Sequence, residues 1–403
     1  MNYLIYLNVL LIPSYIFRFE LCGIPTNVFE IAVAITFIAF LAVQIAKKKK
    51  IKINNVDWAI IFFLFFAFLA ILISPDKRAA LGIFKSWFIA PSLLYFITKE
   101  TIAKKDAYKL AIPVFISLML VTAWAILQKL GIISTLFYQV NDLTFNQYLH
   151  GNVRLFGPFG SPNYLAMFIV PSFFLSLALF SKIKNVALKI LFLLLEVAPL
   201  VVLYYTKSRG GVLALGFGMV IYVLVYSLHK FNIYKSLNLR AIITSIMAVL
   251  TFLVYAFGFY SPNDHARREI YRYAWQMIKS HPVTGIGLDN FQGEILKLSA
   301  GNISFQQNIL SYALHPHNLF LAMWLYVGLG GLIAFLILIL QFFGRAFHSL
   351  HDKMAIFPIA AMTAMLAHGL VDTTFFKNDL SALFFITLAF VIIINQNAEK
   401  NPR

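Results

Sequence analysis

Long apolar stretches recur along the whole chain, separated by short polar breaks. A helix crosses a hydrocarbon core of roughly 30 Å with about 20 predominantly apolar residues. By this length criterion the sequence predicts about twelve membrane-spanning helices, near residues 1–18, 27–46, 56–74, 79–98, 110–128, 162–181, 187–206, 210–228, 241–260, 318–341, 354–371 and 379–396. We therefore expect residues 1–403 to form one all-α membrane domain, a polytopic helical bundle.

Two polar segments, residues 129–161 and 261–317, are much longer than the other breaks. Loops of this length in a compact protein are usually functional. In the second loop, apolar residues recur at helical spacing at Ile270, Tyr273, Ala274 and Met277. This spacing predicts an amphipathic helix from Ala266 to Ser280, ended by His281-Pro282. We expect short helices in this large loop and a functional site at its edge.

Composition and charge support a membrane protein and indicate its orientation. Hydrophobic residues make up 61% of the chain and charged residues 12%, which excludes a water-soluble globule of 403 residues. The net charge of +17 does not indicate a nucleic-acid partner, because the basic residues gather on one side of the twelve-span arrangement. They lie at Lys47 to Lys50, Lys52, Lys99, Lys104, Lys105, Lys109, Lys182, Lys184, Lys189, Lys230, Lys235, Arg240, Arg345, Lys353, Lys400 and Arg403.

The positive-inside rule assigns that side to the cytoplasm, with both termini cytoplasmic and both long loops on the opposite, outer side. Most of this charge is explained by topology and by contact with anionic membrane lipids. The first apolar segment has no basic start and no small-residue cleavage site, so we expect it to remain as a span. With Cys22 as its single cysteine, the chain forms no intramolecular disulfide.

Two short polar motifs border apolar runs on the predicted outer side. His315-Pro316-His317-Asn318 closes the large loop and leads directly into the span that begins at Leu319. Arg209 lies in the tight turn Lys207-Ser208-Arg209-Gly210-Gly211. Ionisable residues packed against a span usually mark a working site. The structural alternatives are a histidine that caps the following helix and an arginine that reaches lipid headgroups.

Four motifs in this order resemble the O-antigen ligase family, in a superfamily shared with O-antigen polymerases and protein O-oligosaccharyltransferases. They are the segment from Arg154-Leu155 to Pro162-Asn163; Ser208-Arg209-Gly210-Gly211; Arg267 followed by Tyr271, Ala274, Pro282, Gly285 and Gly287; and His317-Asn318 followed by Gly328 and Gly331. The resemblance is best from Arg154 to Asp372. Tyr271 occupies a position where the family pattern has tryptophan.

The resemblance implies transfer of a glycan from undecaprenyl diphosphate to the lipid A core oligosaccharide on the periplasmic side. It gives catalytic roles to His317, Arg267 and Arg209, with His317 as the general base. Arg154, Arg268 and Asn318 would contact the substrate. His315 and Arg268 adjoin the motif residues, but the family spacing favours His317 and Arg267.

The chemistry of these residues suits a diphosphate leaving group. Arginine binds phosphate oxygens bidentately without changing its protonation, and histidine titrates near neutrality, as a general base requires. Two or three arginines could replace a divalent metal, so we predict a metal-independent, inverting glycosyltransferase without a cofactor. Lys85 and Arg78 are further candidates for phosphate contact. Asp372, one helical turn after His368, could orient an arginine or the catalytic histidine, or form a purely structural pair.

Three alternatives remain on sequence grounds. An O-antigen or capsule polymerase uses the same donor with a second lipid-linked glycan as acceptor. A protein O-oligosaccharyltransferase is less favoured, because no added periplasmic region follows the last span. A secondary transporter is disfavoured by the absence of a visible repeat and by the gathering of functional groups at one surface.

Overall fold

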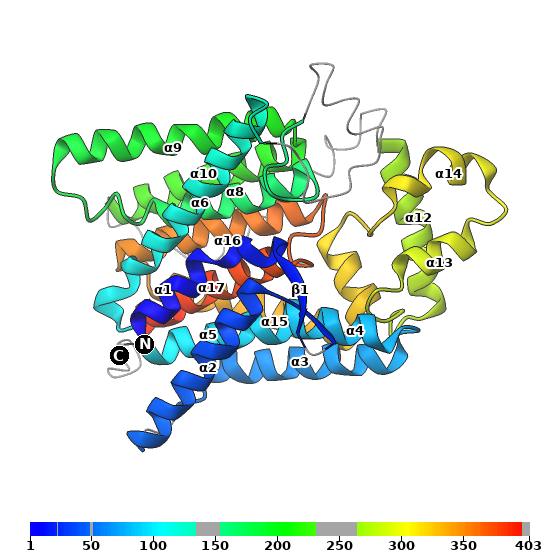
Figure 1. Cartoon of the computed structure of the whole chain (residues 1–403), viewed down its shortest axis with the longest axis horizontal. Helices are drawn as coiled ribbons and strands as arrows, with labels where there is room; N and C mark the ends of the chain where they lie inside the picture. Colours follow the sequence, from blue (N-terminus) through cyan, green and yellow to red (C-terminus); the bar gives the residue numbers. More distant parts are fainter. Residues whose placement is uncertain (22, 49–50, 134–153, 231–263, 397–403) are drawn as a thin grey trace.

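The computed structural model describes residues 1–21, 23–48, 51–133, 154–230 and 264–396 (Figure 1). Eight of the described helices are long and apolar enough to cross a membrane. They are α2 (Val28–Ala46), α3 (Asn55–Ile73), the segment α4-η2-α5 (Lys77–Ile83, Phe84–Ile89 and Ala90–Thr101), η3-α6 (Lys104–Leu110 and Ala111–Lys129), α9 (Val186–Thr206), α10 (Arg209–Lys230), α15 (Leu319–His348) and α17 (Asn378–Asn395).

Two shorter apolar helices complete the described bundle, α8 (Pro162–Ser176) and α16 (Ile356–Gly369), the latter preceded by the 3-10 turn η6 (Lys353–Ala355). The prediction of an all-α polytopic membrane protein is therefore confirmed. The predicted span at residues 241–260 and most of the loop at residues 129–161 lie outside the described residues, so the count of twelve stays a prediction.

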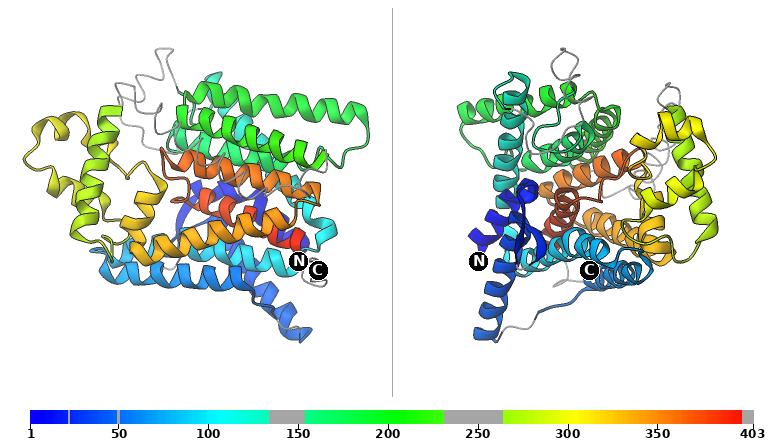
Figure 2. Two further views of the ribbon diagram at one scale, coloured as in Figure 1. Left: turned by 180° about the vertical axis from the view of Figure 1, so that it is seen from behind. Right: turned by 45° about the vertical axis from the view of Figure 1, so that its right-hand side comes forward.

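Helices α16 and α17 form the centre of the bundle. Every residue of both helices is buried. They lie between a group formed by α8, α9 and α10 and a group formed by α3, α5 and α15 (Figure 1, Figure 2). Helices α8 and α10 pack on α16, and α5 packs on α17. The loop between α16 and α17 is thus held at one end of the best-packed part of the molecule.

The N-terminal segment differs from its prediction as a span over residues 1–18. Helix α1 (Asn2–Leu10) ends early and the 3-10 helix η1 (Ile12–Ile16) follows, because Pro13 lacks the N–H that a continuous helix needs. The chain then forms an antiparallel hairpin of β1 (Arg18–Leu21) and β2 (Ile24–Asn27). This hairpin was not predicted, and it brings polar residues against α4 and η2.

The described part of the large loop forms a helical cap at the end of the bundle away from the two termini (Figure 1). Helix α12 (Asp264–Ser280) confirms the amphipathic helix that the sequence predicts, with Ile270, Tyr273, Ala274 and Met277 all buried. Two further helices and a 3-10 turn follow, α13 (Phe291–Leu298), α14 (Ile303–Asn308) and η5 (Leu310–Tyr312).

Two glycines of the sequence motifs join this cap to α15. Gly328 interrupts α15 with φ +72°, and Gly285 has φ +67°, both in the region that disfavours side chains. A Cβ on Gly328 would lie 2.6 Å from the Val283 carbonyl oxygen, and a Cβ on Gly285 would lie 2.4 Å from that of Leu325. The Ile286 N–H donates to the Leu325 carbonyl at 2.7 Å. The glycines therefore allow a backbone contact that fixes the cap on the bundle.

Candidate active site

His317 lies at the junction of the large loop and α15, in a backbone conformation that neighbouring residues hold in place. Its φ is +48°, unusual for a residue with a side chain. The next residue, Asn318, caps α15 by accepting the N–H groups of Phe320 and Leu321, both at 3.0 Å. The Tyr271 hydroxyl of α12 donates to the His317 carbonyl at 2.8 Å. The cap helix thereby fixes the histidine on the bundle.

The imidazole of His317 is mostly buried and faces an oxygen on each side. Its Nδ1 lies 3.5 Å from Oδ1 of Asp372, and its Nε2 lies 3.0 Å from the Tyr312 carbonyl oxygen. Because a carbonyl can only accept, Nε2 carries the proton when this hydrogen bond is made. The carboxylate distance is longer than an ordinary hydrogen bond. Nδ1 can therefore donate to the Asp372 carboxylate only when it also carries a proton, as in the imidazolium.

His315 stacks beside His317 and is the second imidazole of the site. The ring centroids lie 4.1 Å apart, and Nδ1 of His315 accepts the His317 backbone N–H at 3.3 Å. The same nitrogen lies 3.7 Å from Asp372. Burial, followed by the charge of His317, lowers the pKa of His315 to about 3. His315 is therefore neutral at physiological pH.

Asp372 lies in the loop between α16 and α17 and is the negative centre of the site. Oδ2 accepts the side-chain N–H of Asn163 at 2.9 Å, and Oδ1 accepts the Thr373 N–H at 2.9 Å. Burial alone would raise the pKa of Asp372, but its contact with His317 and the positive charge that the surrounding histidines carry when protonated hold the pKa well below its usual range. The carboxylate is thus ionised, and it faces the histidines rather than forming an isolated pair with His368.

Arg154 joins this carboxylate to the arginine turn. Its Nη2 donates to the Asn163 side-chain oxygen at 3.0 Å, and its Nε donates to the Thr206 carbonyl at 2.8 Å. Desolvation, followed by the charge of Arg267, lowers the pKa of Arg154. Arg267 therefore lies near enough to act on Arg154, and it is half-buried. Arg268 is exposed, so the structure distinguishes these adjacent residues.

Arg209 begins α10, three residues after the carbonyl that holds Arg154. The turn before it has Lys207 at φ +50°, and the Ser208 hydroxyl accepts the Gly211 N–H at 3.2 Å. Gly210 lets α10 pack closely on α16, since a Cβ at this position would lie 2.7 Å from the His368 ring. Arg209 is thus an exposed residue at a helix N-terminus, a position that favours anions.

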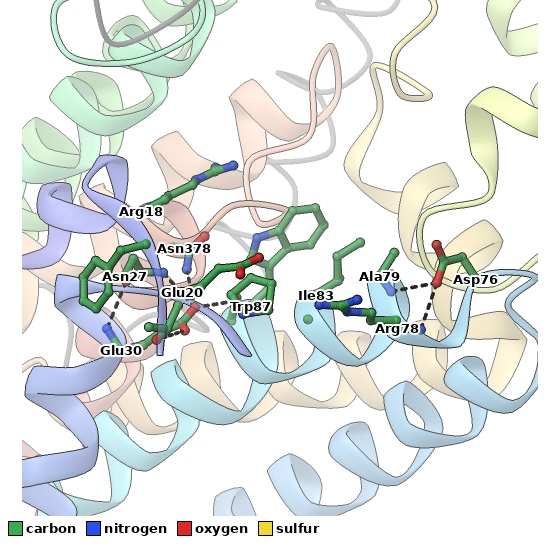
Figure 3. Close-up of a pocket in the computed structure, with 15 residues that line it drawn as sticks. Arg18, Glu20, Asn27, Glu30, Asp76, Arg78, Ala79, Ile83, Trp87 and Asn378 are labelled. Carbon is green, nitrogen blue, oxygen red and sulfur yellow. Dashed lines mark hydrogen bonds between the residues drawn. The ribbon is translucent and has the colours of Figure 1, made fainter. Parts of the chain in front are cut away.

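Three predicted site residues have other surroundings. Lys85 lies in the π-helical segment η2 and pairs with Glu30 at 2.7 Å, and Arg78 donates to the Gly23 carbonyl at 3.2 Å. Arg78 lines the groove between the hairpin and α4, and Glu30, the partner of Lys85, lines the same groove (Figure 3). The amide of Asn318 is occupied by its cap and by the Leu370 carbonyl at 2.9 Å.

The site contains groups that sequence reasoning did not assign. Asn163 belongs to the first motif, but its link between Arg154 and Asp372 depends on the fold. The Tyr312 carbonyl and the Tyr271 hydroxyl gave no sequence signal for their contacts with His317.

The two histidines and the aspartate at the centre of the site could also hold a metal ion. His315, His317 and Asp372 bring one ligand atom each within 4.8 Å of one another. Two imidazoles and one carboxylate suit a first-row divalent ion such as Zn²⁺. Metal independence therefore stays a prediction that needs a direct test.

Comparison with known proteins supports the resemblance seen in the sequence motifs. A family model described as O-antigen ligase matches residues 190–336. This range includes Arg209, Arg267 and His317, whereas Arg154 and Asp372 lie outside it. No curated protein matches the chain.

Proposed function

We propose that the chain transfers a glycan from undecaprenyl diphosphate to the lipid A core oligosaccharide, because residues 190–336 match the O-antigen ligase family model. This match supports ligase-like or polymerase-like glycosyl transfer in general. The donor, the acceptor and the periplasmic face of the inner membrane belong to the proposal. One observation carries it. Asp372 contacts His317 through Oδ1 and, through Asn163, holds Arg154 on Oδ2.

In the proposed reaction an acceptor hydroxyl attacks the anomeric carbon of the donor glycan. The new bond joins the acceptor oxygen to that carbon, and the bond from the carbon to the diphosphate oxygen breaks. Undecaprenyl diphosphate leaves with the electron pair, and His317 takes the hydroxyl proton. A single displacement of this kind inverts the anomeric configuration.

His317 acts as base once its Nε2 is free of the Tyr312 carbonyl. The acceptor hydroxyl takes the place of this carbonyl, and the ring proton moves to Nδ1, which donates a hydrogen bond to the Asp372 carboxylate. A carboxylate on Nδ1 fixes the tautomer and stabilises the imidazolium that forms as the base takes its proton. The 3.5 Å separation of Nδ1 and Asp372 leaves room for this hydrogen bond to shorten.

The arginines supply the charge that the leaving group needs. Attraction between unit charges 4 Å apart is about 4 kcal/mol at an effective dielectric of 20. Arg154 and Arg267 influence each other electrostatically, and Arg209 follows the turn that holds Arg154. Three guanidinium groups at this edge suit a diphosphate because each can donate two hydrogen bonds to phosphate oxygens.

The test is transfer by the full-length protein in nanodiscs, with undecaprenyl diphosphate glycan as donor and a chelator present. Lipid A core and a second lipid-linked glycan are offered as separate acceptors. We expect elongated lipid A core, lost in His317→Ala and in Arg209→Ala. Elongation of the lipid-linked glycan alone would identify a polymerase and overturn the proposed acceptor. A requirement for added metal would overturn the role of the arginines.

A further inference from the structure

A small, partly open cavity lies beside the histidine pair, with His315 in its wall. It has a volume of 200 Å³ and is lined by residues that include Trp87, Tyr164, His315, Tyr326, Thr373 and Lys377. Pockets for drug-sized ligands are larger, about 300 to 1,000 Å³. The cavity would hold roughly seven water molecules, which suits one sugar ring rather than an oligosaccharide.

Its position follows from the two oxygens of Asp372. Oδ2 is linked through Asn163 to Arg154, where the donor diphosphate is expected. Oδ1 faces His315 and His317, and the Thr373 hydroxyl lies 3.4 Å from His315. Since His315 and Thr373 both line the cavity, Asp372 connects the cavity with the group that holds Arg154.

We infer that this cavity binds the terminal sugar of the acceptor glycan and presents its hydroxyl to the histidine pair. This inference rests on the proposed function and adds to it a place for the acceptor. A sugar ring has apolar C–H faces and polar edges. The cavity offers both kinds of contact, because aromatic rings form one part of its wall and hydroxyl, imidazole and ammonium groups form another.

Lys377 is the polar group best placed to orient such a ring. Its ammonium lies 3.9 Å from the centroid of the Tyr164 ring, which is itself 6.2 Å from the His315 ring. Burial lowers the pKa of Lys377 to about 8, so the group remains largely a cation at neutral pH and donates hydrogen bonds. Lys377 and Tyr164 therefore place a donor and an aromatic face on the same wall.

The rest of an acceptor oligosaccharide has a path out of the cavity. A larger groove of 650 Å³ lies between the hairpin and α4, and Ile83 and Trp87 line both spaces. Figure 3 shows Trp87 in this groove together with Arg18, Glu20 and Arg78. Charged and amide side chains of this kind suit a hydroxyl-rich chain. A glycan could then lie in the groove with its last sugar in the cavity.

Saturation-transfer NMR on the full-length protein in nanodiscs tests this placement independently of catalysis. The probe is delipidated lipid A core oligosaccharide, and the repeat-unit oligosaccharide of the donor serves as comparison. Trp87→Ala and Tyr164→Ala are measured with Trp58→Ala, which changes an exposed tryptophan of α3 outside the cavity. Transfer kinetics are recorded for the same proteins.

We expect the acceptor probe to bind and the two cavity variants to weaken its binding and raise the acceptor KM at least tenfold. The donor KM should stay within threefold, and Trp58→Ala should match the wild type. Unchanged acceptor binding and KM in both cavity variants, with normal transfer by the wild type, would overturn the subsite and leave the proposed function standing. Cavity-dependent binding without transfer to lipid A core would support the subsite and reject the proposed function. Loss of donor-oligosaccharide binding alone would overturn the acceptor assignment.

Discussion

The carboxylate of Asp372 lies 3.5 Å from Nδ1 of His317, although the two residues belong to different loops of the bundle. If this contact orients the base, Asp372→Asn should lower kcat by roughly 10² to 10⁴, the range that general-base catalysis contributes. The donor KM should change little, because asparagine can still accept the Asn163 N–H. Steady-state transfer kinetics in nanodiscs measure both constants.

Asp352→Asn provides the matched control for this change. Asp352 pairs with Lys104 at 3.6 Å and caps the 3-10 turn η6, at the opposite end of α16 from Asp372. Its transfer rate should stay within about threefold of the wild type, since exposed pairs contribute at most about 1 kcal/mol. Equal kcat values for the two variants would remove Asp372 from the mechanism.

Arg267 and Arg268 give a second test with a built-in control. Arg267 is half-buried and influences the pKa of Arg154, whereas Arg268 is exposed. Arg267→Ala should lower kcat/KM by about 10- to 150-fold, because a charge-assisted contact to phosphate contributes roughly 1.5 to 3 kcal/mol. Arg268→Ala should remain within threefold. The reverse order would show that the exposed arginine carries the family role.

The Tyr271 hydroxyl supports the unusual backbone of His317 through a 2.8 Å hydrogen bond. Removing it in Tyr271→Phe should lower kcat by up to about tenfold, since one neutral hydrogen bond contributes about 0.5 to 1.5 kcal/mol. Tyr204→Phe removes a hydroxyl from an exposed tyrosine of α9 and should have no effect. Identical kinetics for both variants would mean that Asn318 and the loop alone hold His317 in place.

The sequence predicts best those features that depend on neighbouring residues. Helix α12 follows directly from the spacing of Ile270, Tyr273, Ala274 and Met277, which all become buried. The N-terminal span fails at Pro13, because hydropathy measures apolar length and not the loss of a backbone donor. The hairpin after it was not predicted, because all four residues of β1 are exposed and the strand has no buried face.

The site is less predictable, because its contacts join distant segments. The family motifs name Arg154, Arg209, Arg267 and His317, but no local pattern indicates that Asn163 links Arg154 to Asp372. Lys85 shows the opposite case. Its depth below a periplasmic loop suggested a phosphate contact, whereas the fold places Glu30 at 2.7 Å from its ammonium. Partners of buried charges follow from tertiary packing, which a single sequence does not encode locally.

The contact between the large loop and α15 predicts an unequal response to alanine within one helix. Gly328→Ala places a Cβ 2.6 Å from a carbonyl oxygen at φ +72°, so the loop must move or the helix must straighten. With ψ 178°, Gly328 lies in a backbone region essentially restricted to glycine, and placing a side chain there costs roughly 1 to 3 kcal/mol. We expect Tm to fall by several degrees and transfer to fall with it, because the cap carries Tyr271 and Arg267.

Gly344→Ala is the control in the same helix, where an added Cβ meets nothing within 4 Å. Alanine has the higher helix propensity, by up to about 1 kcal/mol, so Tm should rise slightly or stay constant. A Gly328→Ala protein as stable as Gly344→Ala would show that the kink at Gly328 is not needed to dock the loop. Thermal unfolding in detergent, followed by tryptophan fluorescence, measures both variants.

Acid should destabilise the protein through His315. Its pKa falls from an ordinary value near 6.5 to about 3, because burial and the neighbouring His317 disfavour its charged form. Between these values the unfolded chain binds a proton at this position and the folded protein does not. The free energy of unfolding therefore falls as pH is lowered from about 6.5 toward 3, with a slope of at most about 1.4 kcal/mol per pH unit for this one group.

His315→Gln removes the proton that binds only on unfolding, so its Tm should depend less on pH over this range. His351→Gln, at an exposed histidine near the other end of the bundle, should keep the wild-type slope. Parallel Tm profiles for all three proteins would show that His315 exchanges its proton equally in both states.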